Sequence, residues 1–108
     1  MSASCLLQHA LDSGLYPGPS GKTLGVSLES FDSAAGTARA VFTPREHFCN
    51  PFGTIQGGFV AAMLDETLGL ALATKLTAHE TAPTLELKTS FINPALPGTI
   101  RAAGRVVS

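Results

Sequence analysis

Apolar and polar residues alternate in four stretches of the chain, and this period of two predicts β-strands. The first two stretches, residues 24–32 and 36–44, are joined by a short turn and predict an antiparallel hairpin. The other two, residues 84–93 and 99–108, flank a turn that contains two prolines and a glycine. The sequence stops within the last stretch, so we expect further strands after Ser108 or a second subunit to complete the sheet.

Between the two pairs of strands, residues 57–76 are apolar on nearly every side and contain no proline. This pattern predicts one long helix that is buried on all sides. Residues 4–15 have the spacing of a short amphipathic helix, followed by a loop over residues 16–21. Residues 45–56 show no period and predict a long loop, which in a compact domain usually has a functional role.

The order helix, strand, strand, long helix, strand, strand predicts an α+β fold in which an antiparallel sheet wraps around a central helix. The length of 108 residues fits a single domain. We expect residues 1–23 to form an N-terminal helix and loop, and residues 24–108 to form a core that is incomplete at its C-terminal end.

The charge balance excludes several classes of partner. Charged residues make up 14% of the chain, with a net charge of −1, so a basic surface for nucleic acid or an anionic membrane is not expected. The longest apolar run, residues 59–64, is far shorter than the ~20 residues that span a bilayer. Residues 1–10 lack the features of a signal peptide. We therefore expect a cytoplasmic protein, and the scarcity of charge favours a homo-oligomer.

Cysteine and histidine give no sign of a metal site. Cys5 and Cys49 lie 44 positions apart and predict two free thiols. His9, His47 and His79 share no ligand spacing. The chain also lacks a GxSxG elbow, a P-loop and a dinucleotide fingerprint, so Ser-His-Asp hydrolysis has no support.

Two acidic residues, Asp65 and Glu66, lie in the middle of the predicted buried helix. Burying a carboxylate is costly unless it is paired or hydrogen-bonded, so a carboxylate kept there is a candidate for acid–base or nucleophilic chemistry. Alternatively, one of the two bonds a backbone group or faces solvent. Periodicity does not choose between them.

The start of the same helix offers a second candidate. Gly57 and Gly58 have no side chains to cover the unpaired N–H groups of a first turn, which can polarise a carbonyl or hold an oxyanion. Just upstream, Asn50 and Gln56 carry amides that can donate hydrogen bonds.

Together these residues resemble the hotdog-fold acyl-CoA thioesterases, and within them the phenylacetate-pathway, PaaI-like branch. The most specific part is a glycine pair that opens the helix with an acid seven residues after its second glycine. The resemblance covers about residues 24–108, and the residues that carry it are Asn50–Gly53, Gln56–Gly58, Asp65, Thr84–Leu87, Phe91–Ala95 and Gly98.

The resemblance implies a role for each matching residue. Asp65 would activate or orient the attacking water, or attack the thioester itself, and Thr84 would help to orient the water. The N–H of Gly57, aided by Asn50, would polarise the thioester carbonyl. The substrate would be an aryl- or medium-chain acyl-CoA, no metal or other cofactor would be needed, and the site would lie between two subunits of a dimer or a dimer of dimers.

One departure from that family is Gln56, which stands where most of the branch has histidine. Glutamine donates to a carbonyl but takes no proton, so Gln56, like Gly58, is given a substrate-binding role only. Two alternatives stay open: a non-catalytic hotdog module that binds acyl-CoA, and a hotdog dehydratase or hydratase. The second rests on His47-Phe48, but Asp65 follows His47 by eighteen positions, which is longer than in those enzymes.

Overall fold

Three antiparallel strands form one sheet in the order β1-β2-β3 in the computed structural model, which describes residues 4–107. They are β1 (Val26–Asp32), β2 (Thr37–Phe42) and β3 (Ile100–Arg105). β2 lies in the middle and pairs with both neighbours. The predicted hairpin and last strand are therefore confirmed, while Ser108, the last residue of that predicted strand, lies outside the described residues, as do residues 1–3.

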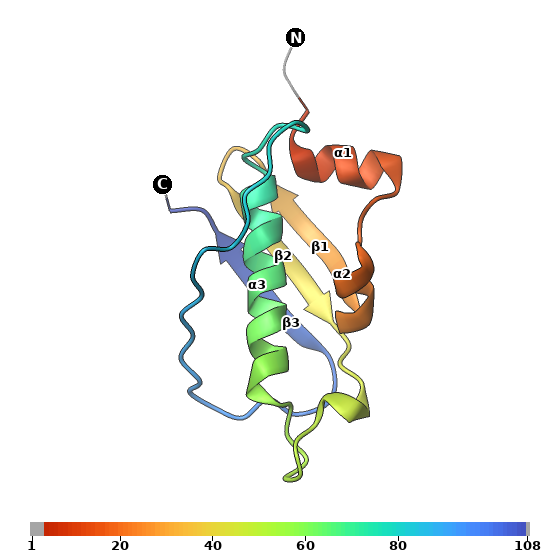
Figure 1. Ribbon diagram of the computed structural model, residues 1–108, viewed down its shortest axis with the longest axis vertical. Helices are drawn as coiled ribbons and strands as arrows, with labels where there is room; N and C mark the ends of the chain where they lie inside the picture. The colour runs from red at the N-terminus through yellow and green to blue at the C-terminus, as the bar shows by residue number, and fades with distance from the viewer. Residues whose placement is uncertain (1–3, 108) are drawn as a thin grey trace.

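The long helix α3 (Gly57–Ala73) crosses one face of this sheet, against β2 and β3 (Figure 1). Its residues Met63, Thr67, Leu70 and Ala71 are buried. A glycine permits the close approach, because a Cβ at Gly104 of β3 would lie 3.0 Å from the carbonyl oxygen of Thr67. The predicted α+β class, with an antiparallel sheet against a long helix, is confirmed. The largest fully buried side chains are Phe42, Phe48, Leu7, Met63 and Thr67.

Before the sheet come two short helices, α1 (Leu6–Ser13) and α2 (Pro19–Leu24). The first was expected, but the prediction of a loop over residues 16–21 is wrong in its second half. Proline fits the first turn of a helix, and Gly25 ends α2 in the left-handed conformation, with φ of 73°. Six residues are too few to show a helical period. The predicted loop over residues 45–56 contains only one short 3-10 turn, η1 (Glu46–Phe48).

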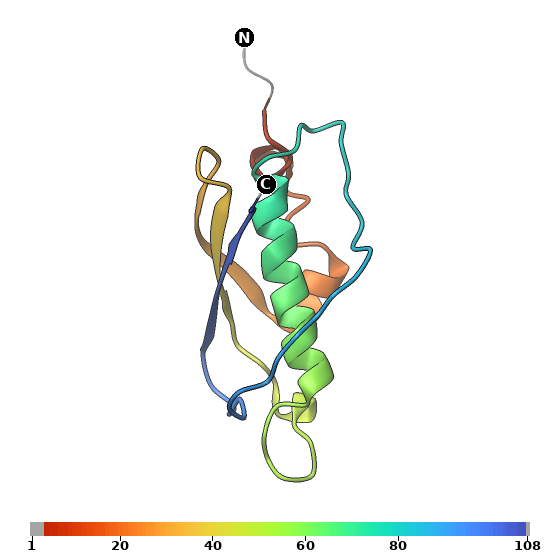
Figure 2. The same ribbon diagram turned by 90° about the vertical axis from the view of Figure 1, so that its left-hand side faces the viewer.

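Two details of the predicted central helix are wrong. It ends at Ala73, three residues early, and it is not buried on all sides, since Leu68 is 45% exposed. The physical reason is that the sheet covers one side of α3, whereas the other side is covered only in part, by an irregular segment and the short helix α2 (Figure 2). Within residues 4–107, no helix is long and apolar enough to cross a membrane.

That irregular segment, residues 82–99, corrects the prediction of a strand over residues 84–93. It runs along α3 on the side away from the sheet and pairs with no described strand (Figure 2). An alternating pattern describes two faces, but a strand also needs a partner for its backbone groups. The segment is fixed near its end, where the N–H of Ile55 donates to the carbonyl of Ala95 at 2.8 Å. Its exposed large apolar side chains are Leu85, Leu87, Phe91, Ile92 and Leu96.

Candidate active site

Asp65 and Thr84 are brought together from elements 19 residues apart. The Thr84 hydroxyl donates a hydrogen bond of 2.9 Å to Oδ1 of Asp65. Asp65 lies half-buried in the middle of α3, and Thr84 lies at the start of the segment 82–99. The bond leaves Oδ2 of Asp65 and the lone pairs of the threonine oxygen available to a further hydrogen-bonding group.

A cavity of about 340 Å³ opens beside this pair. Its walls come from α2, from α3 and from the start of the segment 82–99. A smaller hollow of about 160 Å³ adjoins Asp65 and Thr84 and is also lined by Glu86. The cavity is lined by Ser20, Leu24, Ala62, Asp65, Glu66, Gly69, Ala82, Pro83 and Thr84.

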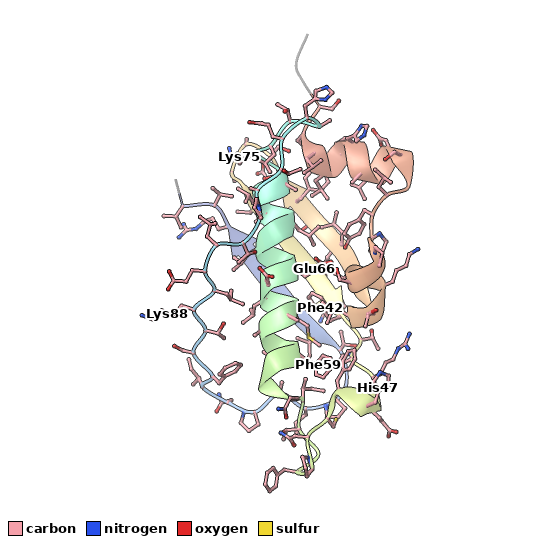
Figure 3. The ribbon with its side chains drawn as sticks, viewed as in Figure 1. Phe42, His47, Phe59, Glu66, Lys75 and Lys88 are labelled. Carbon is pink, nitrogen blue, oxygen red and sulfur yellow. The ribbon has the colours of Figure 1, made fainter. Side chains whose placement is uncertain are left out.

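Glu66 points into the same cavity, half-buried, from the next position of α3. Figure 3 shows it at mid-helix. Burial, and then the charge of Asp65, raise the pKa of Glu66 above its ordinary value. Burial, and then the charge of Glu66, raise the pKa of Tyr16 to about 12. The Tyr16 hydroxyl is buried and has no hydrogen-bond partner among the described residues.

The first turn of α3 keeps free donors. Within residues 4–107, the N–H groups of Gly57 and Gly58 donate to no backbone or side-chain acceptor, and Gln56 provides no side-chain cap. A Cβ at Gly58 would meet nothing within 4 Å, whereas one at Gly57 would lie 3.5 Å from the Phe91 ring. Gln56 is exposed. This end of the helix can therefore receive a carbonyl oxygen.

The side chain of Asn50 forms hydrogen bonds within its own loop. Its Nδ2 donates to the Thr54 hydroxyl at 2.8 Å, and its Oδ1 accepts from the N–H groups of Phe52 and Thr54. One proton of the amide remains free for a ligand. These bonds fix the side chain within the loop that leads into α3.

The predicted site residues therefore fall into two groups at different heights of α3. Asp65 and Thr84 form one group, and residues 50 and 56–58 form the other. Gly57 and Asp65 are eight residues apart, which is about 12 Å along a helix at 1.5 Å per residue. A single carbonyl group cannot touch both in the same chain.

The cavity wall formed by α2 is what sequence reasoning missed. Pro19 and Gly25, a proline at a helix start and a glycine just past its end, were the available signal. Elsewhere, His47 packs edge-on against Phe48 at a centroid distance of 5.0 Å. Cys5 and Cys49 are free thiols. No group of three or more His, Cys, Asp or Glu side chains in the described part of the chain could hold a metal ion.

Comparisons with known proteins agree with this architecture. The model of the thioesterase superfamily matches residues 52–108. A phenylacetic acid degradation-related protein from Ralstonia eutropha JMP134 is 30% identical, with a TM-score of 0.86 over 95% of this chain and 78% of that chain. Among proteins with curated functions, none matches.

More distant solved structures share the fold. The PaaI protein of the Escherichia coli phenylacetic acid degradation operon is 20% identical, with a TM-score of 0.75 over 94% of this chain and 71% of that chain. Thioesterase superfamily member 2 from Mus musculus is also 20% identical, with a TM-score of 0.73 over 100% of this chain and 77% of that chain. These structures agree with the hotdog fold, and the superfamily match and the 30% identical relative confirm the PaaI-like resemblance.

Proposed function

Because the chain belongs to the thioesterase superfamily, we propose that it hydrolyses an aryl- or medium-chain acyl-CoA to the free acid and CoA. The observation that carries the proposal is the hydrogen bond between Thr84 and Asp65 at the edge of a cavity of about 340 Å³. In this proposal the cavity receives the acyl group, and the thioester carbonyl lies beside the Asp65 carboxylate. A thioester is already activated, so the reaction needs no metal or redox cofactor.

In this mechanism Asp65 is the general base. Its free Oδ2 accepts a proton from a water molecule, whose oxygen attacks the carbonyl carbon of the thioester. The Thr84 oxygen accepts a second hydrogen bond from that water and holds it in line. The carbonyl oxygen becomes an oxyanion, which then collapses as the C–S bond breaks. The CoA thiolate leaves and takes up the proton.

The donors at the start of α3 receive the oxyanion. The free N–H of Gly57 points along the positive end of the helix dipole, and the remaining amide proton of Asn50 adds a second donor. Gln56 and Gly58 bind the substrate: the glutamine amide donates to a polar oxygen, and the glycine leaves room for it. None of these donors changes its protonation state.

The two groups serve one reaction if two copies of the chain meet. The separation of about 12 Å between Gly57 and Asp65 excludes a site within one chain. In a homodimer, or a dimer of dimers, Gly57 of one subunit faces Asp65 of the other. The exposed Leu85 and Ile92 of the segment 82–99 supply apolar surface for such an assembly. The low charge content and the lack of a membrane or nucleic-acid signal in the sequence fit a cytoplasmic enzyme.

The test is release of free thiol from a panel of aryl- and fatty-acyl-CoAs. Asp65→Asn keeps the size of the side chain and removes its basicity, so kcat should fall at least about a hundredfold. Asp12→Asn makes the same change on an exposed position of α1 and should leave kcat unaltered.

Two results would overturn the assignment. Unchanged turnover in the Asp65→Asn protein would remove this residue from the mechanism and direct attention to Glu66. Acyl-CoA binding without turnover in either protein would show the alternative, a hotdog module that binds acyl-CoA without hydrolysing it.

A further inference from the structure

The cavity beside Asp65 has an uneven charge. Two of its lining residues are acidic, Asp65 and Glu66, and none is lysine, arginine or histidine. The remaining polar members are the hydroxyl residues Ser20 and Thr84. An anionic group that entered this space would meet two carboxylates and no cation, and it would also lose its hydration.

Glu66 lies in the cavity wall and packs against α2. A Cβ at Gly21 of α2 would lie only 2.6 Å from Oε1 of Glu66, so the carboxyl group rests directly on the glycine backbone. The carboxyl is also near enough to Tyr16 for its charge to raise the pKa of the phenol. Among the described residues, Glu66 forms no hydrogen bond and no ion pair. No partner among these residues therefore neutralises its charge.

The mechanism above assigns no step to this second carboxylate. We propose that Glu66 is a specificity-determining residue, which restricts the cavity to uncharged acyl groups and excludes acyl groups that end in a carboxylate. The inference rests on the proposed thioesterase function and adds to it the class of acyl group. Specificity of this kind comes from a repulsive element rather than from a new attraction.

The size of the effect follows from Coulomb's law. Two unit charges about 6 Å apart at an effective dielectric constant of about 20 repel each other enough to change a rate by on the order of a hundredfold. Salt and the openness of the site reduce this, so we expect a discrimination of about ten- to a hundredfold from Glu66.

The experiment compares two acyl-CoAs of the same shape. Glutaryl-CoA ends in a carboxylate, and 5-methylhexanoyl-CoA replaces its two carboxylate oxygens with methyl groups. The ratio of kcat/KM for the two is measured at pH 8, well above the ordinary range of a carboxyl group. The wild type should strongly prefer 5-methylhexanoyl-CoA. Glu66→Gln should lower this preference at least about tenfold by raising activity on glutaryl-CoA.

Glu86→Gln is the matched control. Glu86 lines the smaller hollow on the other side of the Asp65–Thr84 pair, so the change removes an equal charge near the same site. It should leave the preference as it is in the wild type. If Glu86→Gln alters the preference and Glu66→Gln does not, the acyl group occupies the other hollow and the inference is wrong.

The experiment distinguishes a failure of the role proposed for Glu66 from a failure of the proposed thioesterase function. Hydrolysis of 5-methylhexanoyl-CoA with a preference that Glu66→Gln leaves unchanged overturns the role of Glu66 alone. If the wild type hydrolyses neither compound, the same preference is read from dissociation constants measured by isothermal titration calorimetry; the proposed function fails only if no member of the acyl-CoA panel is hydrolysed. Circular dichroism checks the fold of Glu66→Gln, and Glu66→Met gives a second uncharged variant if that protein does not fold.

Discussion

The two sides of α3 differ in what covers them. One side packs on the sheet through Met63, Thr67, Leu70 and Ala71, all buried and without a charge. The opposite side carries Asp65 and the exposed Leu68. It faces away from the sheet, and it is covered by the irregular segment 82–99 and, beside Asp65, by the short helix α2 (Figure 2). The same helix thus contributes to the core on one side and to the candidate site on the other.

The difference shows how a nearly uniformly apolar helix can serve two purposes. Where a regular sheet covers it, side chains interdigitate and leave no space, as the contact of Gly104 with the helix backbone illustrates. Where an irregular segment covers it, hollows remain beside Asp65. We therefore expect substitutions on the sheet side to change stability, and substitutions on the segment side to change activity.

The largest expected effect is on the sheet side. Met63 is 2% exposed, and Met63→Ala should lower the free energy of unfolding by about 2–5 kcal/mol, because it leaves a cavity that the neighbours fill only in part. Leu68→Ala is the matched change on the segment side and should cost less than about 1 kcal/mol, since Leu68 is 45% exposed. Urea denaturation of both variants measures the difference.

Protein concentration sharpens that comparison. If a second copy covers Leu68, the cost of Leu68→Ala should grow with protein concentration, because the assembly then contributes to stability. The cost of Met63→Ala should not grow with protein concentration, because Met63 is buried within the subunit. Equal costs for both variants at every concentration would contradict the distinction between the two sides.

A smaller effect, on activity alone, is expected from Thr84. Removing its hydroxyl in Thr84→Val deprives Asp65 of a 2.9 Å hydrogen bond and leaves the shape nearly unchanged, so kcat/KM should fall about tenfold. Thr84→Ser restores the hydroxyl and should recover most of the activity. Because Thr84 is exposed, the free energy of unfolding should barely change; a large loss of stability in Thr84→Val would assign the residue to the fold instead.

The two sides of α3 also differ in how much of their structure could be predicted from the sequence. The hairpin and α3 follow from local periods, because each residue's environment there repeats every two or nearly four positions. The segment 82–99 has the same alternation as the hairpin, yet it forms no strand. Pairing depends on a partner elsewhere, and no local pattern supplies that information.

The candidate site, too, could be predicted from the sequence only in part. The resemblance selected Asp65 and Thr84, which the structure brings into contact, and the glycine pair, whose N–H groups it leaves free. The catalytic and binding roles themselves stay predictions. The surroundings of Glu66 could not be predicted from the sequence, because they depend on Gly21 in a six-residue helix that is too short to show a period. The sequence alone does not show what packs on each of two adjacent acids.

The smallest expected effect is the pH dependence that Glu66 adds to stability. In the folded protein its pKa is raised above the ordinary 4.5, first by burial and then by the charge of Asp65, so the folded state holds this proton more tightly than the unfolded state. Below the pKa that Glu66 has in the unfolded state, the protonated carboxyl group makes its full contribution to the stability of the folded protein. This contribution is lost as the pH rises through the higher pKa of Glu66 in the folded state. The stability of Glu66→Gln relative to wild type should therefore increase between pH 4 and pH 8. Urea denaturation at the two pH values measures this, with the exposed Glu86→Gln as control, and a constant difference would mean that ionised Glu66 meets no penalty in the folded chain.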